Sequence, residues 1–285
     1  MKKIGFITSQ EHSNLYHDDR HLIEPFRKES IEIEPVIWDT ENDFSDLSLL
    51  IFRSAWDYHF KTEKFKNWLE ELEKQDVKIL NPLSIIQQNY DKFYLKNLSE
   101  KSLPIIPTAF YENVEGLDLK SVLKENNWQK AVIKPAVSMS AYQTFSFDKS
   151  NCEILQKDLK KHFEDSKVII QEFAHEIVEE GEWSLIFFDK HYCTTILKKP
   201  KKGDFRVQGE LGGTSQVAQP SERVIWQAQK ILFSFDEPLL YARVDGIIRN
   251  GNFQLMELEL IDPELFFRVN PKAITSFLAG IKKRL

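Results

Sequence analysis

The chain has 285 residues, enough for about two domains of roughly 150 residues each, and its apolar fraction of 42% is sufficient for packed cores. The formal charge of −6 excludes a general electrostatic attraction to nucleic acid or to an anionic membrane. Two widely separated cysteines give neither a metal-binding spacing nor a disulfide framework. No stretch has the apolar length of a membrane span or of a signal peptide. We therefore expect a cytoplasmic protein without nucleic-acid or membrane partners.

The first third of the chain alternates between strand-like and helix-like segments. Helical spacing of apolar side chains is clearest at Phe65, Trp68, Leu69 and Leu72. We predict strands at residues 2–8, 31–38, 47–54 and 77–82, and helices at residues 18–30 and 61–75. This alternation predicts a Rossmann-like α/β domain over residues 1–84, with a parallel sheet covered by helices.

The rest of the chain, residues 85–285, mixes hairpins with helices and predicts an α+β domain. We expect helices at residues 91–102, 120–128, 152–163, 222–235 and 271–285, and a strand at residues 167–173. Hairpins are expected at residues 131–147, 181–197 and 241–264. The proline-marked stretch 103–111 is interpreted as a connector.

The last hairpin brings acidic side chains close together. Because side chains alternate along a strand, Glu257 and Glu259 share one face. A two-residue Asn-Gly turn would place Asp245 opposite Met256. A three-residue Asn-Gly-Asn turn would place Asp245 opposite Glu257, and Arg243 opposite Glu259. The sequence leaves both registers open.

The second register opposes two carboxylates, which destabilises a sheet unless their charge is compensated. A bound Mg²⁺ would compensate it, because this ion takes one or two protein carboxylates and completes its shell with phosphate oxygens and water. The other interpretation is an edge hairpin whose acids face water.

Three further segments are typical of contact with an anion or a nucleotide. Lys134 lies inside an apolar strand, so it must extend to the surface, pair with an acid or meet a ligand anion, and the polar tip 138–144 beside it could cover a phosphate. The linker between residues 171–173 and Glu182 could bind an adenine edge and ribose hydroxyls, or be an ordinary acidic loop. Residues 198–215 combine a basic run, one arginine and four glycines, which suits either phosphate contact or a solvated loop.

In the N-terminal domain, Arg53, Trp56 and Asp57 directly follow a predicted strand. Ligands of open α/β sheets gather beyond the carboxyl ends of strands, so these residues are candidates for substrate binding. Trp56 and Tyr58 could equally be packing residues. His17 and His21 have the spacing of a helical metal pair, but we favour a helix start with its aspartates near the N-terminal dipole. The chain contains no Gly-x-Ser-x-Gly, Walker A or Rossmann glycine motif.

Taken together and in this order, the charged motifs resemble those of the ATP-grasp ligases. The resemblance covers roughly residues 82–285. It rests on Asp91-Lys92, Lys134-Pro135, Gln171-Glu172-Phe173, Gly181-Glu182, Asp204-Phe205-Arg206, Arg243-Val244-Asp245 and Glu257-Leu258-Glu259. The stretches RSAWDYHFKTEKFKNWL and LNPLSIIQQNYDK further resemble the branch that includes the O-ureido-serine cyclo-ligase and is related to prokaryotic glutathione synthetase and the RimK-type ligases.

The resemblance implies an ATP-grasp fold in which two α+β lobes, about residues 85–168 and 169–285, enclose ATP. The implied nucleotide contacts are Lys92, Lys134, Gln171, Glu172, Phe173 and Glu182. The implied ligands for one or two Mg²⁺ ions, which Mn²⁺ could replace, are Asp245, Glu257 and Glu259. Catalytic roles fall to Lys134, Arg206 and Arg243, and part of the second substrate's site to Arg53, Trp56 and Asp57.

The activity implied by the resemblance is ATP- and Mg²⁺-dependent carbon–nitrogen ligation through an acyl phosphate, with release of ADP and phosphate. Its partners would be a small-molecule carboxylate and an amine, and a homodimer is a common state in the superfamily. The alternatives are a small-molecule phosphotransferase and a nonenzymatic nucleotide-binding protein. Two positions depart from the usual pattern: Glu259 replaces a common asparagine, and the loop after Lys134 is poor in glycine.

Overall fold

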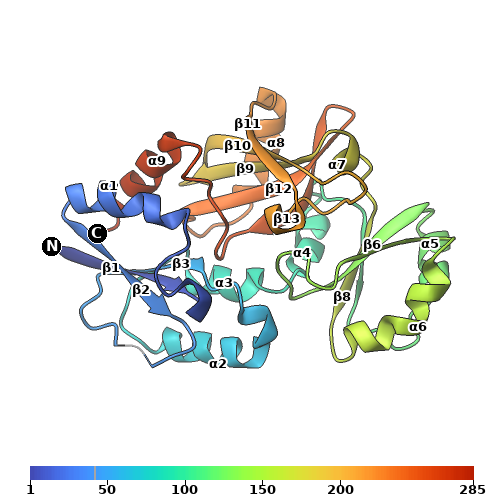
Figure 1. The fold of residues 1–285 in the computed structure, drawn as a ribbon, viewed down its shortest axis with the longest axis horizontal. Coiled ribbons are helices and arrows are strands. Elements are labelled where there is room, and N and C mark those ends of the chain that lie inside the picture. Colours follow the sequence, from blue (N-terminus) through green and yellow to red (C-terminus); the bar gives the residue numbers. More distant parts are fainter. Residues whose placement is uncertain (42) are drawn as a thin grey trace.

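The computed structural model describes residues 1–41 and 43–285, which form three separate β-sheets with helices packed on them (Figure 1). One sheet is parallel and lies at the N-terminal end, and the other two are antiparallel. This mixed architecture confirms the predicted fold class. Within the described ranges, no helix is long and apolar enough to cross a membrane.

The N-terminal sheet has the strand order β2-β1-β3-β4, and all of its strand pairs are parallel, as the alternating pattern predicted. Its strands are β1 (Lys2–Thr8), β2 (Ile31–Ile37), β3 (Leu50–Ser54) and β4 (Ile79–Leu80). The predicted first helix is divided into a 3₁₀ turn, η2 (Asp19–Leu22), and a short helix, α1 (Ile23–Lys28). Helix α2 (Thr62–Glu73) buries the expected face through Phe65, Leu69 and Leu72.

Two helices, α3 (Leu83–Asn89) and α4 (Tyr94–Glu100), lead from this domain into the rest of the chain. Helix α4 was predicted, whereas α3 was not, because it follows the Asn-Pro pair that we interpreted as a boundary. Proline is well tolerated just before the first helical residue, so Pro82 starts this helix instead of only ending the strand.

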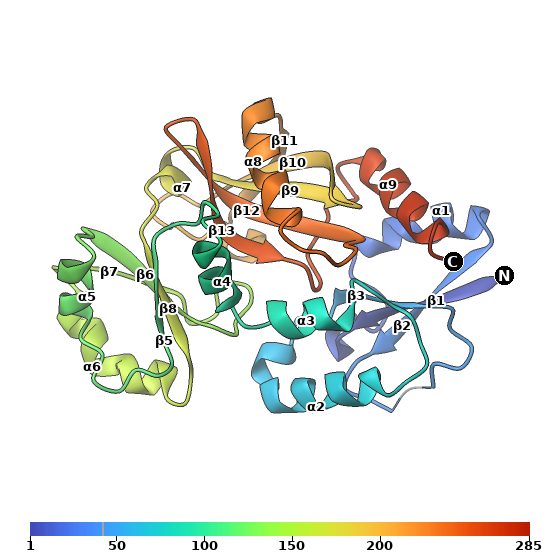
Figure 2. The same cartoon turned by 180° about the vertical axis from the view of Figure 1, so that it is seen from behind.

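The first lobe contains the antiparallel sheet β5-β8-β6-β7. Its strands are β5 (Thr108–Tyr111), β6 (Lys130–Pro135), β7 (Phe145–Asp148) and β8 (Val168–Glu172). Helices α5 (Leu119–Glu125) and α6 (Cys152–Phe163) lie on its outer side, away from the rest of the molecule (Figures 1 and 2). Strand β5 lies in the stretch predicted as a connector, and β8 pairs within this sheet although the predicted lobe boundary falls at its start.

The second lobe contains the antiparallel sheet β11-β10-β9-β12-β13. Its strands are β9 (Glu182–Phe188), β10 (His191–Lys199), β11 (Thr214–Ala218), β12 (Tyr241–Arg249) and β13 (Asn252–Glu259). The short helix α7 (Glu176–Glu179) precedes the sheet, and α8 (Glu222–Leu232) packs on it. Strand β11 was not predicted, because its exposed residues have no apolar alternation. The tight turn at Asp189 and Lys190 is confirmed, and both residues have the left-handed φ of a short hairpin.

The C-terminal helix α9 (Pro271–Lys282) lies beside α1 and joins the two ends of the chain in one hydrophobic core (Figure 2). Its Phe277 contacts the rings of Phe6 and Phe26 from the N-terminal domain and those of Phe188 and Tyr241 from the second lobe. The N-terminal sheet and the second lobe are therefore packed as one body.

A buried asparagine ties the same two parts together by hydrogen bonds. The amide nitrogen of Asn81 donates to the carbonyl oxygens of Tyr241 and Leu260 at 2.9 and 2.7 Å, and its oxygen accepts from the backbone N–H of Leu240 at 2.7 Å. Asn81 has no exposed surface, so water cannot replace these bonds.

We expect Asn81→Ala to lower the free energy of unfolding by about 3 kcal/mol, because it leaves several buried backbone groups without partners. Denaturant unfolding monitored by tryptophan fluorescence would measure the change. Asn113→Ala, at an exposed turn where the side chain accepts only one local N–H, is the control and should change stability by less than about 1 kcal/mol. Equal effects for the two variants would contradict the anchoring role of Asn81.

Candidate active site

The carboxylate hairpin combines features of both predicted registers. Its turn is the short one: Asn250 and Gly251 have φ of 53° and 74°, and Arg249 faces Asn252. A β-bulge then shifts the pairing by one residue between Asp245 and Gly246. Beyond the bulge, the register is the one predicted for a three-residue turn.

As a result, Asp245 lies opposite Glu257, and Arg243 lies opposite Glu259. The bulge depends on close approach of the two backbones at Gly246. A Cβ atom at this position would collide with the carbonyl oxygen of Gln254. Glycine is therefore required here, and it fixes which side chains face one another across the hairpin.

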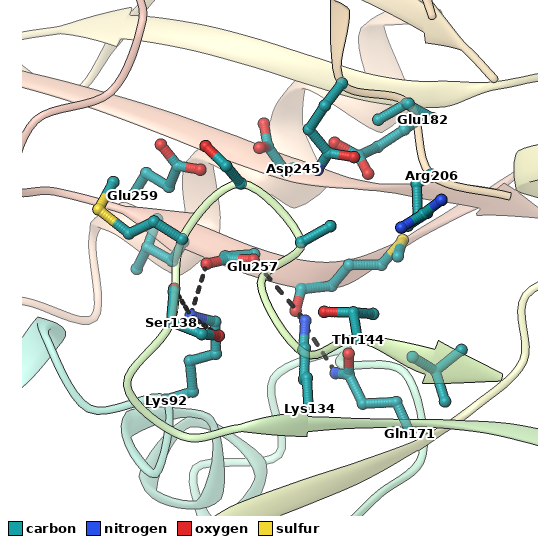
Figure 3. A pocket seen from close by; sticks show the side chains of 18 of the residues that line it. Lys92, Lys134, Ser138, Thr144, Gln171, Glu182, Arg206, Asp245, Glu257 and Glu259 are labelled. Carbon is teal, nitrogen blue, oxygen red and sulfur yellow. Dashed lines mark hydrogen bonds and ion pairs between the residues drawn. The ribbon is translucent and has the colours of Figure 1, made fainter. Parts of the chain in front are cut away.

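The hairpin forms one wall of a large pocket between the two lobes, with the first lobe's sheet opposite (Figure 3). The pocket brings together every nucleotide, metal and catalytic residue predicted from the sequence. These are Lys92, Lys134, Gln171, Glu172, Phe173, Glu182, Arg206, Arg243, Asp245, Glu257 and Glu259. Residues separated by more than 160 positions in the chain thus converge on one place.

Glu257 is the centre of the first charge cluster. Its carboxylate lies 3.2 Å from the Nζ of Lys92 and 3.7 Å from the Nζ of Lys134 (Figure 3). Burial opposes ionisation of Glu257, but the two lysines outweigh it and hold its pKa below the usual range. Burial lowers the pKa of Lys134, which the charge of Lys92 reinforces. Two lysines therefore share one acid and have capacity for further anionic groups.

The loop after β6 covers this cluster. The Nζ of Lys92 donates to the carbonyl oxygen of Ser138 at 2.5 Å. Although the loop is poor in glycine, Ser140, Ala141 and Gln143 have left-handed φ values, so it makes turns of the kind that glycine usually provides. Ser138, Met139, Ser140 and Ala141 all line the pocket.

Arg243 organises the second charge cluster. Its Nε donates to Asp245 at 3.0 Å, and its Nη2 donates to Glu259 at 2.5 Å. Burial raises the pKa of Glu259 to about 8, despite the charge of Arg243. Burial also opposes ionisation of Asp245, but Arg243 and Lys198 outweigh it and lower its pKa. Of the two acids bound to Arg243, Glu259 therefore has the raised pKa and Asp245 the lowered one.

Lys198 is a member of the site that sequence reasoning did not identify. It is 9% exposed, and its Nζ lies 2.5 Å from Glu182 and 3.4 Å from Asp245. We had grouped it with the basic run that follows, as a solvated loop or an anion contact. A signal was present, because Lys198 continues the apolar strand TTIL in the same way that Lys134 continues AVI.

The opposite end of the pocket is apolar and suits a planar ring. Phe173, Ala174 and Ile177 line it, and the Nε2 of Gln171 points to the carbonyl oxygen of Met256 at 3.4 Å. Other predicted contacts are already paired within the protein. Glu172 accepts from Arg249 at 2.7 Å, and Arg206 forms an ion pair with Asp204 at 2.8 Å.

The predicted substrate residues of the N-terminal domain do not lie together in one pocket. Arg53 is 1% exposed and donates to Asp19 at 2.8 and 3.1 Å, so it is a buried structural cation and lines neither of the two pockets described here. Asp57 accepts from Trp38 at 2.6 Å and from Lys61 at 2.7 Å, and it also lies outside them. Only Trp56 reaches a pocket. Arg53 and Asp57 thus already have partners within the protein.

Trp56 lines a second pocket that adjoins the first. The two pockets share residues including Met139, Ser140, Lys198, Arg243 and Glu259. The rest of the second pocket includes Tyr16, His17, Glu210, Glu264, Phe266 and Arg268. His17 thus faces a cavity.

The part of the chain that the structure describes contains no group of three or more His, Cys, Asp or Glu side chains arranged to hold a metal ion. The absence of such a group has a local cause, since Asp245, Glu257 and Glu259 each turn toward a lysine or arginine. Their chemistry nevertheless fits Mg²⁺. They are hard oxygen donors on adjacent strands of one pocket, and burial raises the pKa of Glu259, so a bound cation would favour its ionised form.

The chain is similar to known proteins in its N-terminal part and over its whole length. Residues 4–81 match the family model described as the N-terminal domain of D-cycloserine synthetase DcsG. The chain is 23% identical, over 298 residues, to the cycloserine biosynthesis protein DcsG of Streptomyces lavendulae, and the match covers 99% of this chain and 98% of that protein.

Solved structures are similar over the whole chain. The crystal structure of D-cycloserine synthetase DcsG matches with a TM-score of 0.88 and 22% identity over 99% of each chain. D-alanine–D-alanine ligase from Bacillus anthracis matches with a TM-score of 0.70 and 16% identity, covering 100% of this chain and 99% of that one. The ATP-grasp ligase PsnB, complexed with a minimal precursor, matches with a TM-score of 0.65 and 15% identity, covering 98% and 99%.

The chain therefore has the ATP-grasp fold, preceded by an N-terminal α/β domain, and the resemblance to ATP-grasp ligases predicted from its sequence is confirmed. Within that fold it is similar to the cycloserine branch, which the N-terminal match, the whole-chain sequence match and the structural match have in common.

Proposed function

We propose that this chain is an ATP- and Mg²⁺-dependent carboxylate–amine ligase that works through an acyl phosphate. The observation that carries the proposal is the convergence of lysine, arginine and carboxylate side chains on one pocket of an ATP-grasp fold. Relatives with this fold include a synthetase and several ligases, and one related ligase structure contains ATP.

The nucleotide would lie along the pocket with its base near Phe173 and its ribose near Glu182. Lys92 and Lys134 would exchange part of their contact with Glu257 for contact with phosphate oxygens. Asp245, Glu257 and Glu259 would hold Mg²⁺. When bound, this ion neutralises phosphate charge and aligns the transferred phosphoryl group.

The chemistry needs positioned charge and no protein nucleophile. A carboxylate oxygen of the first substrate attacks the γ-phosphorus, and the bond from that phosphorus to the leaving oxygen of ADP breaks. The amine nitrogen of the second substrate then attacks the acyl carbon, and phosphate leaves. Arg243, fixed between Asp245 and Glu259, is placed to stabilise charge that develops during these steps.

The second pocket is the proposed site for the substrates other than ATP. It shares Lys198 and Arg243 with the nucleotide pocket, so a carboxylate there would lie beside the phosphate-binding groups. Its walls come from the N-terminal domain and both lobes. Enclosure by three parts of the protein, together with whole-chain similarity to the cycloserine synthetase, favours small molecules over a peptide.

The direct test is ADP release by the purified protein with ATP and Mg²⁺, assayed against pooled amino acids and small carboxylates. We expect at least one pool to raise ADP release by tenfold or more over ATP alone, with phosphate and a new amide as the other products. Mass spectrometry would identify the amide. A phosphorylated substrate without amide would indicate a phosphotransferase, and ATP binding without turnover in any pool would favour a nucleotide-binding protein.

A further inference from the structure

Asp262 is a buried carboxylate that the mechanism above does not use. It lines the nucleotide pocket and is 3% exposed. Among the described residues, its Oδ2 atom has no hydrogen-bond partner. A buried carboxylate oxygen without a donor is costly, so this atom is suited to a donor that a ligand supplies.

The position of Asp262 along the chain places it toward the second pocket. Strand β13 passes the apolar end of the nucleotide pocket at Met256 and then presents Glu257 and Glu259, and Asp262 follows. The carbonyl oxygen of Asp262 accepts from the Nε1 of Trp56 at 2.8 Å, and Trp56 lines the second pocket. Asp262 therefore lines the nucleotide pocket, follows Glu259 in the chain, and is linked through Trp56 to the second pocket, the proposed substrate site.

Arg53 and Arg243 are the cations that act on the Asp262 carboxylate. Burial raises its pKa to about 7, although Arg53 lowers it. Arg53 donates to Asp19 through Nε and Nη2, while its buried Nη1 has no partner among the described residues, and Arg243 is bonded to Asp245 and Glu259. The charged or titratable groups that face Asp262 are Arg53 on β3, Tyr58 of the 3₁₀ turn η3 (Tyr58–Phe60), and Tyr241 and Arg243 on β12.

We propose that Asp262 binds the ammonium group of the second substrate and acts as its general base, a role that rests on the proposed ligase function. The carboxylate takes one proton from R–NH₃⁺, and the nitrogen lone pair that this frees forms the bond to the acyl carbon. The C–O bond to phosphate breaks, its electron pair leaves with the phosphate, and the second nitrogen-bound proton passes to that phosphate. Asp262 then returns its proton to solvent.

The test compares two nucleophiles in wild type and Asp262→Asn. Hydroxylamine is largely uncharged at neutral pH and traps an acyl phosphate without a base, whereas the pooled amino acids present ammonium groups. We expect Asp262→Asn to keep ATP binding and hydroxamate formation within about threefold of wild type, and to lower amide formation from amino acids about 10²–10⁴-fold.

The pH profile separates a base from a purely structural role. The carboxylate must be ionised to accept a proton, so wild-type amide formation should fall as the pH drops through about 7, the pKa of Asp262. For Asp262→Asn, the rate should rise about tenfold per pH unit up to the pKa of the amine, because solvent then supplies the free amine. Asp39→Asn, which alters a carboxylate outside both pockets, should leave both reactions unchanged.

Amide formation by Asp262→Asn at the wild-type rate and pH profile would overturn the proposal, and so would equal loss of hydroxamate and amide. A wild-type protein that makes hydroxamate but transfers to no amine would also count against it. If wild type makes no hydroxamate with any carboxylate, the ligase function itself fails, and the role of Asp262 falls with it.

Discussion

Glu257→Gln is expected to lower ADP release about 10³-fold while the protein stays folded. The substitution keeps the size of the side chain but removes the negative charge that lies 3.2 Å from Lys92 and 3.7 Å from Lys134. The two lysines then repel each other without a shared partner, and the proposed metal site loses its central ligand. Both effects weaken the contacts that the pocket is proposed to make with the phosphate groups of ATP.

Calorimetric titration with ATP, with and without Mg²⁺, would report binding independently of turnover. Wild type should bind ATP more tightly with Mg²⁺, and Glu257→Gln should lose most of that difference. Glu176→Gln is the matched control, because Glu176 is also a partly buried, ion-paired glutamate but pairs with Arg249 outside the pocket. Retention of full Mg²⁺ dependence by Glu257→Gln would contradict the metal-binding role.

Lys198→Met is expected to lower kcat about 10²–10³-fold. Lys198 is buried between Glu182 and Asp245 and lines both pockets, so it is the cation that connects the nucleotide site to the substrate site. Methionine preserves the length of the side chain and removes its charge. The two acids would then lack a shared cation where phosphate charge has to be stabilised.

Steady-state kinetics with ATP varied would separate kcat from KM, and a thermal melt would establish that the variant is folded. Lys198→Arg should recover part of the rate, since it restores charge with a different shape. Lys190→Met is the control, because Lys190 caps the exposed end of the same hairpin and binds the carbonyl oxygen of Phe235. An unchanged kcat in Lys198→Met would contradict a role for the charge of Lys198 in the reaction.

The hairpin illustrates how far the sequence could lead. Alternation of side chains and the Asn-Gly pair were enough to give two candidate registers. The choice depended on a bulge, and the bulge depends on how closely the backbone of Gly246 approaches Gln254. That contact joins residues on two strands and has no signature within either strand alone.

Charged residues inside apolar strands were the most informative signal, and they were also the easiest to misread. Lys134 and Lys198 both end buried strands in the pocket, but only Lys134 was selected. Arg53 ends a buried strand as well, yet it faces Asp19 and aromatic rings instead of a ligand. The sequence pattern indicates that a buried charge needs a partner, and it does not indicate whether that partner is protein or ligand.

Two edge strands were missed for a related reason. Strands β5 and β11 each lie at the border of a sheet, and neither has a clear two-residue alternation of apolar side chains. They are held by backbone pairing to a neighbour that is distant in sequence or separated by a loop. Helix α6, in contrast, has the predicted bounds, because its apolar face is encoded within the helix itself.

The hydrophobic cores divide the molecule into a larger body, made of the N-terminal domain and the second lobe, and a smaller body, the first lobe. The larger body contains both ends of the chain, which α9 packs together, and the smaller body has its own core within residues 114–170. Lys134 belongs to the smaller body and Glu257 to the larger one, so their ion pair connects the two bodies across the nucleotide pocket. A phosphate that draws Lys134 away from Glu257 would replace this ion pair with a contact to the ligand, while the core within residues 114–170 stays as it is.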